Sequence, residues 1–126
     1  MAENDRVQLG EDVRHTLKMN LDTSSHSFDA IDPTFSADVD KFLSAACFGD
    51  VWARPGLDLK MRRLLTIAML AALGRERQLR SHLAGALNDG ISLEQVRETI
   101  VHVIPYAGFP AGLTGLQLLN EVVKNQ

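Results

Sequence analysis

The sequence contains a single cysteine, Cys47, among its 126 residues. One cysteine rules out an internal disulfide and any Cys-x-x-Cys redox pair, so we interpret Cys47 as a small buried apolar residue. With that cysteine and four scattered histidines, no ligand spacing typical of zinc or an iron–sulfur cluster occurs. We therefore expect no metal site and no cofactor of that kind.

The chain also lacks an apolar run long enough to span a membrane. Its longest run, residues 64–73, is about half of the roughly 20 residues that a spanning helix needs. The N-terminal residues are polar, without the basic stretch and following apolar stretch of a secretory signal. We expect a cytoplasmic protein that does not bind a membrane.

Aromatic residues make up only 6% of the chain, and no aromatic stripe or recognised nucleic-acid-binding motif occurs. The net charge is −3, so nucleic acid is not an expected partner. Residues 54–80 nevertheless carry seven basic and two acidic side chains, a charge of +5 against −8 for the remainder. This segment is either a solvated basic face or a positive cleft that concentrates a small anionic substrate.

No strand-like alternation of apolar and polar residues is present, whereas helical spacing recurs along most of the chain. We predict an all-α fold of about six helices in a single domain, residues 1–126. The predicted helices cover residues 5–19, 34–52, 58–73, 78–88, 92–104 and 110–123. Residues 1–33 are expected to form a peripheral helix and a loop.

Particular residues indicate where these helices begin and end. Asp58 is a predicted N-cap, Gly74 a predicted left-handed residue after the helix, and Ser92 with Gln95 a predicted capping box. Pro105 should end or kink its helix, because proline lacks an N–H and clashes with the preceding turn. The four residues after it are expected to form a bend.

From residue 64 onward, the predicted helix over residues 58–73 is apolar on nearly every side. A domain of this size normally leaves one side of each helix in water, so this helix needs cover that one chain does not supply. We therefore predict a homo-oligomer.

Two of the four histidines lie in the stretch 78–110. His82 lies on the flank of an apolar stripe, where we expect a partly buried ring with one free edge. His102 lies almost opposite the stripe of the next helix, with Glu98 one turn before it, and would face water in a monomer. The alternatives are a hydrogen-bonded structural histidine for His82 and a simple surface pair for Glu98 and His102.

Several spaced blocks resemble the carboxymuconolactone decarboxylase family. They read RPGL at 54–57, RLLTIA at 63–68, LRSHL at 79–83, ALNDG at 86–90 and YAGFPA at 106–111. The resemblance is strongest over residues 48–122. It implies an alkylhydroperoxidase-like helical bundle that assembles as a hexamer or a trimer.

The resemblance also implies a cofactor-free decarboxylase, similar to 4-carboxymuconolactone decarboxylase, that acts on a small lactone or keto-acid carboxylate by general acid–base catalysis. The candidate catalytic residues are His82, Glu98 and His102. The candidate substrate-binding residues are Arg54, Arg80 and Tyr106. Two alternatives stay open: a non-catalytic oligomeric binding or scaffold protein, and a thiol-dependent alkylhydroperoxidase-like protein, although the Cys-x-x-Cys motif of that branch is missing.

Overall fold

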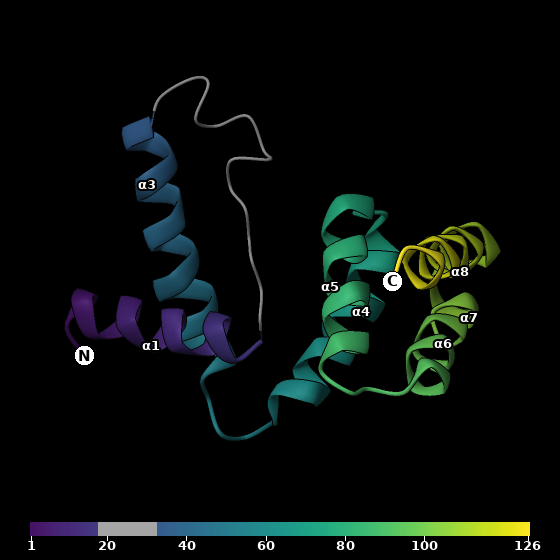
Figure 1. Cartoon of the computed structure of the whole chain (residues 1–126), viewed down its shortest axis with the longest axis horizontal. Helices are drawn as coiled ribbons and strands as arrows, with labels where there is room; N and C mark the ends of the chain where they lie inside the picture. Colours follow the sequence, from purple (N-terminus) through teal and green to yellow (C-terminus); the bar gives the residue numbers. More distant parts are fainter. Residues whose placement is uncertain (18–32) are drawn as a thin grey trace. The chain divides into compact units, whose positions relative to one another are not determined.

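The computed structural model describes residues 1–17 and 33–126, which are helical apart from short connections and include no strand. The all-α prediction is therefore confirmed. The helices are α1 (Glu3–Thr16), α3 (Pro33–Phe42), the π-helix η2 (Leu43–Trp52), α4 (Leu59–Leu73), α5 (Glu76–Asn88), α6 (Leu93–Val101), α7 (Ile104–Ala107) and α8 (Phe109–Lys124) (Figure 1). The loop predicted between the helices 5–19 and 34–52 lies outside the described residues, except for Pro33.

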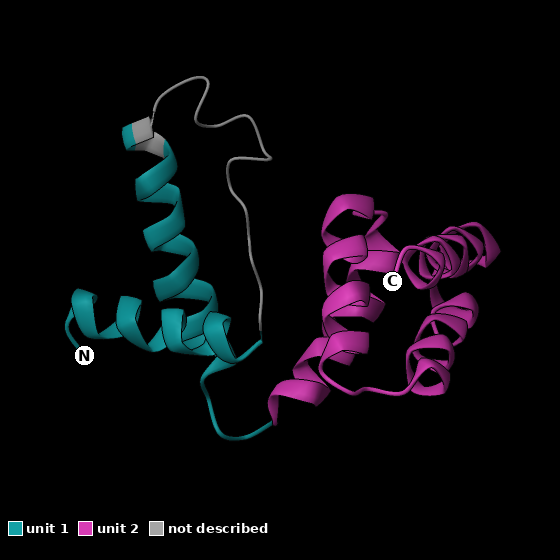
Figure 2. Ribbon diagram, viewed as in Figure 1, with its two compact units in different colours: residues 1–57 teal, residues 58–126 magenta. Residues whose placement is uncertain are grey.

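The chain divides into two compact units, Met1–Leu57 and Asp58–Gln126 (Figure 2). The first unit consists of α1, α3 and η2, and the second consists of α4 to α8. The organisation of the whole chain as one domain remains a prediction.

In the first unit, α1 and η2 meet backbone to backbone at two glycines. A Cβ atom at Gly10 would lie 1.7 Å from the carbonyl oxygen of Ser44, and one at Gly49 would lie 2.4 Å from that of Arg6. The helix predicted over residues 34–52 does form as one continuous run, but its second half is π-helical, which the apolar spacing did not indicate.

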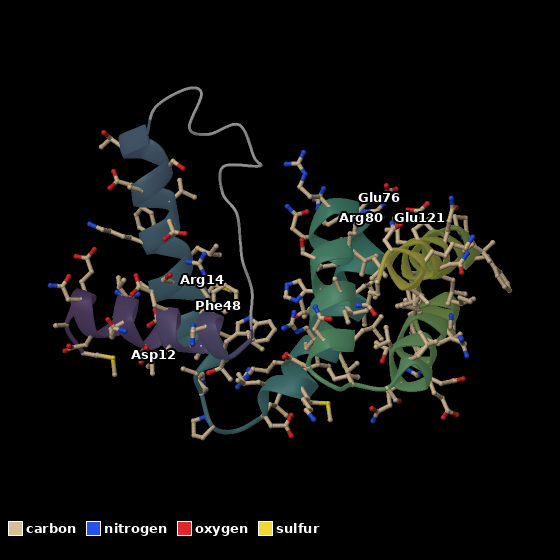
Figure 3. The ribbon with its side chains drawn as sticks, in the orientation of Figure 1. Asp12, Arg14, Phe48, Glu76, Arg80 and Glu121 are labelled. Carbon is tan, nitrogen blue, oxygen red and sulfur yellow. The ribbon has the colours of Figure 1, made fainter. Side chains whose placement is uncertain are left out.

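Arg14 ties α1 to the same run through its guanidinium. Its Nη1 donates to Asp40 Oδ1 at 3.0 Å and to Ser44 Oγ at 2.7 Å. Its Cζ lies 5.9 Å from the centroid of the Phe48 ring, within the range of a cation–π contact (Figure 3). Polar contacts thus support the packing of the first unit.

In the second unit, the predicted caps at Asp58, Gly74 and Ser92 are confirmed. Asp58 caps α4 by accepting a 2.7 Å hydrogen bond from the amide of Met61, and Gly74 follows α4 with a φ of 73°. Ser92 and Gln95 form the capping box at the start of α6. These short-range contacts set where α4 ends and where α6 begins.

The chain around Pro105 differs from the prediction. Helix α6 ends at Val101, before the expected end, and Pro105 lies in the first turn of the short helix α7. Proline is tolerated there because first-turn N–H groups have no partner within the helix. Tyr106 is therefore helical, and Gly108, with a φ of 95°, makes the bend before α8.

The core of the second unit is formed by α4, α5, α6 and α8. Its buried residues are Ile67, Ala71, Leu79, Leu83, Ala86, Ile91, Val96, Ile100, Val103, Leu118, Leu119 and Val122. Helix α8 comes close to its neighbours at Gly112, where a Cβ would lie 2.3 Å from Ile104, and at Gly115, where it would lie 2.9 Å from Ile100. This core packs α4 against α5, the two helices that carry Arg63 and His82.

Candidate active site

A buried arginine lies beside a histidine in the second unit. Arg63 shares the buried stripe of α4 with Ile67 and Ala71, and its side chain is 0% exposed. Its Nη1 lies 3.4 Å from Nδ1 of His82 on α5. A charged donor therefore faces one of the two ring nitrogens of His82, a predicted catalytic residue.

Asp89, at the end of α5, supplies the counter-charge of this arginine. Arg63 Nη2 donates to Asp89 Oδ2 at 3.1 Å. Burial lowers the pKa of Arg63, and the charge and hydrogen bond of Asp89 oppose that effect. Taking an ion out of water costs several kcal/mol, so the buried guanidinium needs the carboxylate of Asp89 to offset that cost.

Gly85 provides the space for the guanidinium. A Cβ at this position would lie 2.1 Å from Nη1 and 2.7 Å from Cζ of Arg63. Any larger residue would require the arginine to move. Gly85, Asp89 and His82 thus all lie on or at the end of α5, against one side chain of α4.

His82 is buried more deeply than the sequence suggested, with 7% of its surface exposed instead of one free edge on a flank. Burial, and secondly the positive charge of Arg63, lower its pKa from 6.5 to about 4. The part that His82 plays in general acid–base catalysis stays a prediction. At neutral pH its imidazole is uncharged and works through hydrogen bonds.

Two members of this group, Arg63 and Asp89, were not among the residues singled out from the sequence. Arg63 lies within the basic segment 54–80, and Asp89 lies within the block ALNDG at 86–90. The signal that could have identified Arg63 is its place four and eight residues before Ile67 and Ala71, on the buried face of α4. A cation on such a face requires a buried partner.

His102 and Tyr106 lie together at the corner between α6 and α7. Both side chains are exposed, as expected for His102 in a single chain, and their ring centroids are 5.5 Å apart. They line an apolar groove of about 260 Å³ together with α4 residues that include Met69. Glu98 is exposed one turn earlier, and its carbonyl accepts the backbone N–H of His102 at 3.0 Å.

Arg80 lies on the solvent side of α5. Its Nη2 is 2.9 Å from Oε2 of Glu121 on α8, and both side chains are more than two-fifths exposed (Figure 3). An exposed pair of this kind contributes little to stability and exchanges readily with other ions. Arg80 therefore contacts a carboxylate of its own chain, and its role toward a substrate remains a prediction.

Arg54 and Cys47 belong to the first unit. Arg54 is exposed in the turn that follows η2, so its relation to His82 stays a prediction. Cys47 is half-buried, not fully buried, and burial raises the pKa of its thiol. Because the thiolate is the reactive form, this environment does not favour a reactive cysteine.

Within residues 1–17 and 33–126, no group of three or more His, Cys, Asp or Glu side chains is arranged to hold a metal ion. Over the same residues, no helix combines the length and apolarity needed to cross a membrane.

The profile of the carboxymuconolactone decarboxylase family matches residues 37–121, which include His82, Glu98 and His102. The chain belongs to this family. It is 43% identical over 91 residues to 4-carboxymuconolactone decarboxylase of Acinetobacter baylyi, across 72% of this chain and 68% of that protein. The family assignment from the sequence blocks is thus confirmed.

Two further relatives show how varied the family is. Nitrosuccinic acid decarboxylase of Metarhizium robertsii is 32% identical over 62% of this chain and 54% of its own length. An uncharacterised 15.0 kDa protein of Paracoccus denitrificans is 29% identical over 92% of this chain and 86% of its own length. The names of the Acinetobacter and Metarhizium relatives support a decarboxylase-like function for this protein.

Proposed function

We propose that this protein is a cofactor-free decarboxylase that acts on a small lactone or keto-acid carboxylate. The observation that carries the proposal is its 43% identity to 4-carboxymuconolactone decarboxylase over about two-thirds of that protein. The name of the fungal relative, nitrosuccinic acid decarboxylase, supports the reaction type, although its substrate is of another kind.

The chemistry of such a substrate explains why no cofactor is needed. When the bond to the departing carboxylate breaks, its electron pair passes through the conjugated system to the lactone carbonyl oxygen, and carbon dioxide leaves. The resulting enolate then takes up a proton at carbon. The protein has to orient the carboxylate, stabilise the charge on the oxygen and supply the proton.

We assign charge stabilisation to His82. A neutral imidazole has one N–H group, which can donate a hydrogen bond to the developing oxyanion while the ring stays uncharged. Its low pKa, about 4, supports this role better than that of proton donor. Donors placed at a developing oxyanion typically contribute about 100- to 1,000-fold to kcat.

The proton donor we propose is His102, assisted by Glu98, with Tyr106 lining the pocket and Arg54 and Arg80 attracting the anionic substrate. Support for His102 comes from its exposed ring beside Tyr106, which a substrate could reach. We propose that His102 of one subunit approaches His82 of another across a contact in a homo-oligomer.

Carbon dioxide release tests this function. The purified protein is supplied with 4-carboxymuconolactone and a panel of keto acids at neutral pH, without added metal or cofactor. We expect turnover that falls at least about 100-fold in His82→Gln. The matched control is His15→Gln, which makes the same substitution at an exposed position near the end of α1.

The outcomes separate the competing functions. Inactivity toward the whole panel would favour a non-catalytic binding or scaffold protein. A His82→Gln variant that retains full activity would remove His82 from the mechanism. Peroxide reduction that disappears in Cys47→Ser would instead identify the thiol-dependent branch of the superfamily.

A further inference from the structure

We infer that Arg63 is a positioning residue that sets the tautomer of His82, so that the imidazole proton resides on Nε2. The two side chains meet inside the second unit, where Arg63 Nη1 lies 3.4 Å from His82 Nδ1. Decarboxylation by itself does not require Arg63 to contact His82. In this arrangement the protein orients the histidine before a substrate binds.

The direction of this hydrogen bond follows from the two groups. A guanidinium carries five N–H donors and has no acceptor, whereas a neutral imidazole has one nitrogen that donates and one that accepts. A proton on Nδ1 would point toward another N–H, and both donors are buried. Nδ1 must therefore accept, which leaves the proton on Nε2.

Three features hold the guanidinium against Nδ1. Asp89 accepts a 3.1 Å hydrogen bond from Nη2 of Arg63, and Gly85 leaves the space that the guanidinium occupies. Arg63 also lies on the buried face of α4. A 0% exposed arginine of this kind has no route into water without opening the helix contact between α4 and α5. The tautomer is thus set by packing that exists in the free protein.

The consequence for catalysis rests on the proposed function. An Nε2–H donor whose direction is set beforehand costs no reorganisation when the oxyanion forms, which is the condition under which such donors are most effective. Arg63 itself is buried, so it acts through His82 and not on the substrate. The pKa of His82 is lowered first by burial and secondly by the charge of Arg63, and the second effect agrees with a cation placed beside the ring.

Nitrogen NMR of the substrate-free protein tests the inference directly. Long-range proton–nitrogen correlation of a sample with labelled histidines distinguishes a protonated ring nitrogen from an unprotonated one. The His82 signals are identified by their loss in His82→Gln. We expect at pH 7 an unprotonated Nδ1 and a protonated Nε2; the opposite pattern, or an even mixture, would overturn the inference.

Gly85→Ala tests the part played by Arg63. Its new methyl group would occupy the place of Nη1, so the guanidinium must withdraw, while alanine remains favourable in a helix. We expect the two His82 nitrogen shifts to move toward each other as both tautomers become populated. Gly56→Ala is the matched control because a Cβ at Gly56 meets nothing within 4 Å, and its His82 signals should equal those of the wild type.

A second variant covers the case in which Gly85→Ala does not fold. Arg63→Met with Asp89→Asn removes both charges together, so no buried ion is left without its partner. The same loss of tautomer preference is expected, and an unchanged Nε2–H signature in either folded variant would show that Arg63 does not set it. These spectra need no substrate, so a failed decarboxylase assay would refute the proposed function and leave this inference standing.

Discussion

At the residue scale, the group formed by Arg63, His82 and Asp89 changes what His82 can do. Histidine is usually considered as an acid or base that titrates near neutrality. Here burial and a neighbouring cation keep the ring uncharged at neutral pH. The same environment that weakens His82 as an acid leaves it as a neutral hydrogen-bond donor.

This environment predicts a pH dependence of stability. The pKa of His82 is about 4 in the folded chain and near 6.5 when unfolded, so between these values the unfolded state binds more protons. The contribution is fully present above pH 6.5 and is lost as the pH falls to about 4. Its full size is on the order of 3 kcal/mol.

Urea unfolding at pH 7 and at pH 4.5 measures the effect. The free energy of unfolding of the wild type should fall more steeply with decreasing pH than that of His82→Gln, which lacks the titrating group. Parallel pH profiles of the two proteins would show that His82 titrates normally in the folded state.

At the element scale, helix ends and helix contacts depend on different residues. The caps at Asp58 and Ser92 satisfy first-turn amides within a few residues, so they could be read from the sequence. The contact between α1 and η2 depends instead on Gly10 meeting the carbonyl of Ser44, far along the chain. A glycine within an α-helix is a weak sequence signal unless its partner is known.

Gly10→Ala should therefore destabilise the first unit. The added methyl group cannot be accommodated by a side-chain rotation, because the atom that it meets belongs to the backbone of Ser44. We expect a net loss of about 2 kcal/mol, after the gain in helix propensity of alanine. Chemical unfolding followed by circular dichroism measures it, with Gly56→Ala as the control; equal stabilities would contradict the close contact.

At the scale of the whole molecule, α4 displays an apolar face to water. Met61, Leu65, Met69 and Leu73 follow one another at intervals of four residues and are between 44% and 65% exposed. The sequence predicts a helix here that one chain does not fully cover. We propose that a second copy of the chain covers this face in a homo-oligomer, with a hexamer or trimer as the expected form.

Met69→Glu tests this assembly. A carboxylate in the centre of the face would have to be desolvated in the contact, so we expect dissociation into smaller species by size exclusion with light scattering. Gln78→Glu adds the same side chain at an exposed position of α5 and should leave the assembly intact. A wild-type protein that runs as a stable 13.9 kDa monomer would contradict the proposal.

A site shared between subunits makes a further prediction for the assembled protein. Subunits with His82→Gln and subunits with His102→Gln would each be inactive alone. When the two are co-expressed, some sites would combine His82 of one chain with His102 of another, and decarboxylation should partly return. Continued inactivity of the mixed oligomer would place both histidines of each site in the same chain.

The helices and most of their ends were predictable from the sequence, because they depend on spacing and caps within a few neighbouring residues. The family was predictable from the resemblance of several blocks between residues 54 and 111. The sequence also indicated correctly that His102 is exposed. Where the prediction differed, at the π-helix and at Pro105, the backbone adopted a local alternative that apolar spacing does not distinguish.

The chemical state of His82 depends on contacts between parts of the chain that are distant in the sequence. Arg63, the cation beside it, is 19 residues away in the sequence, and Asp89, the counter-ion of Arg63, is 26 residues from that arginine. Periodicity gives the side of a helix on which a residue lies, but not the depth of burial or the charge that packs against it. The pKa depends on both, because each changes the free energy of the charged form.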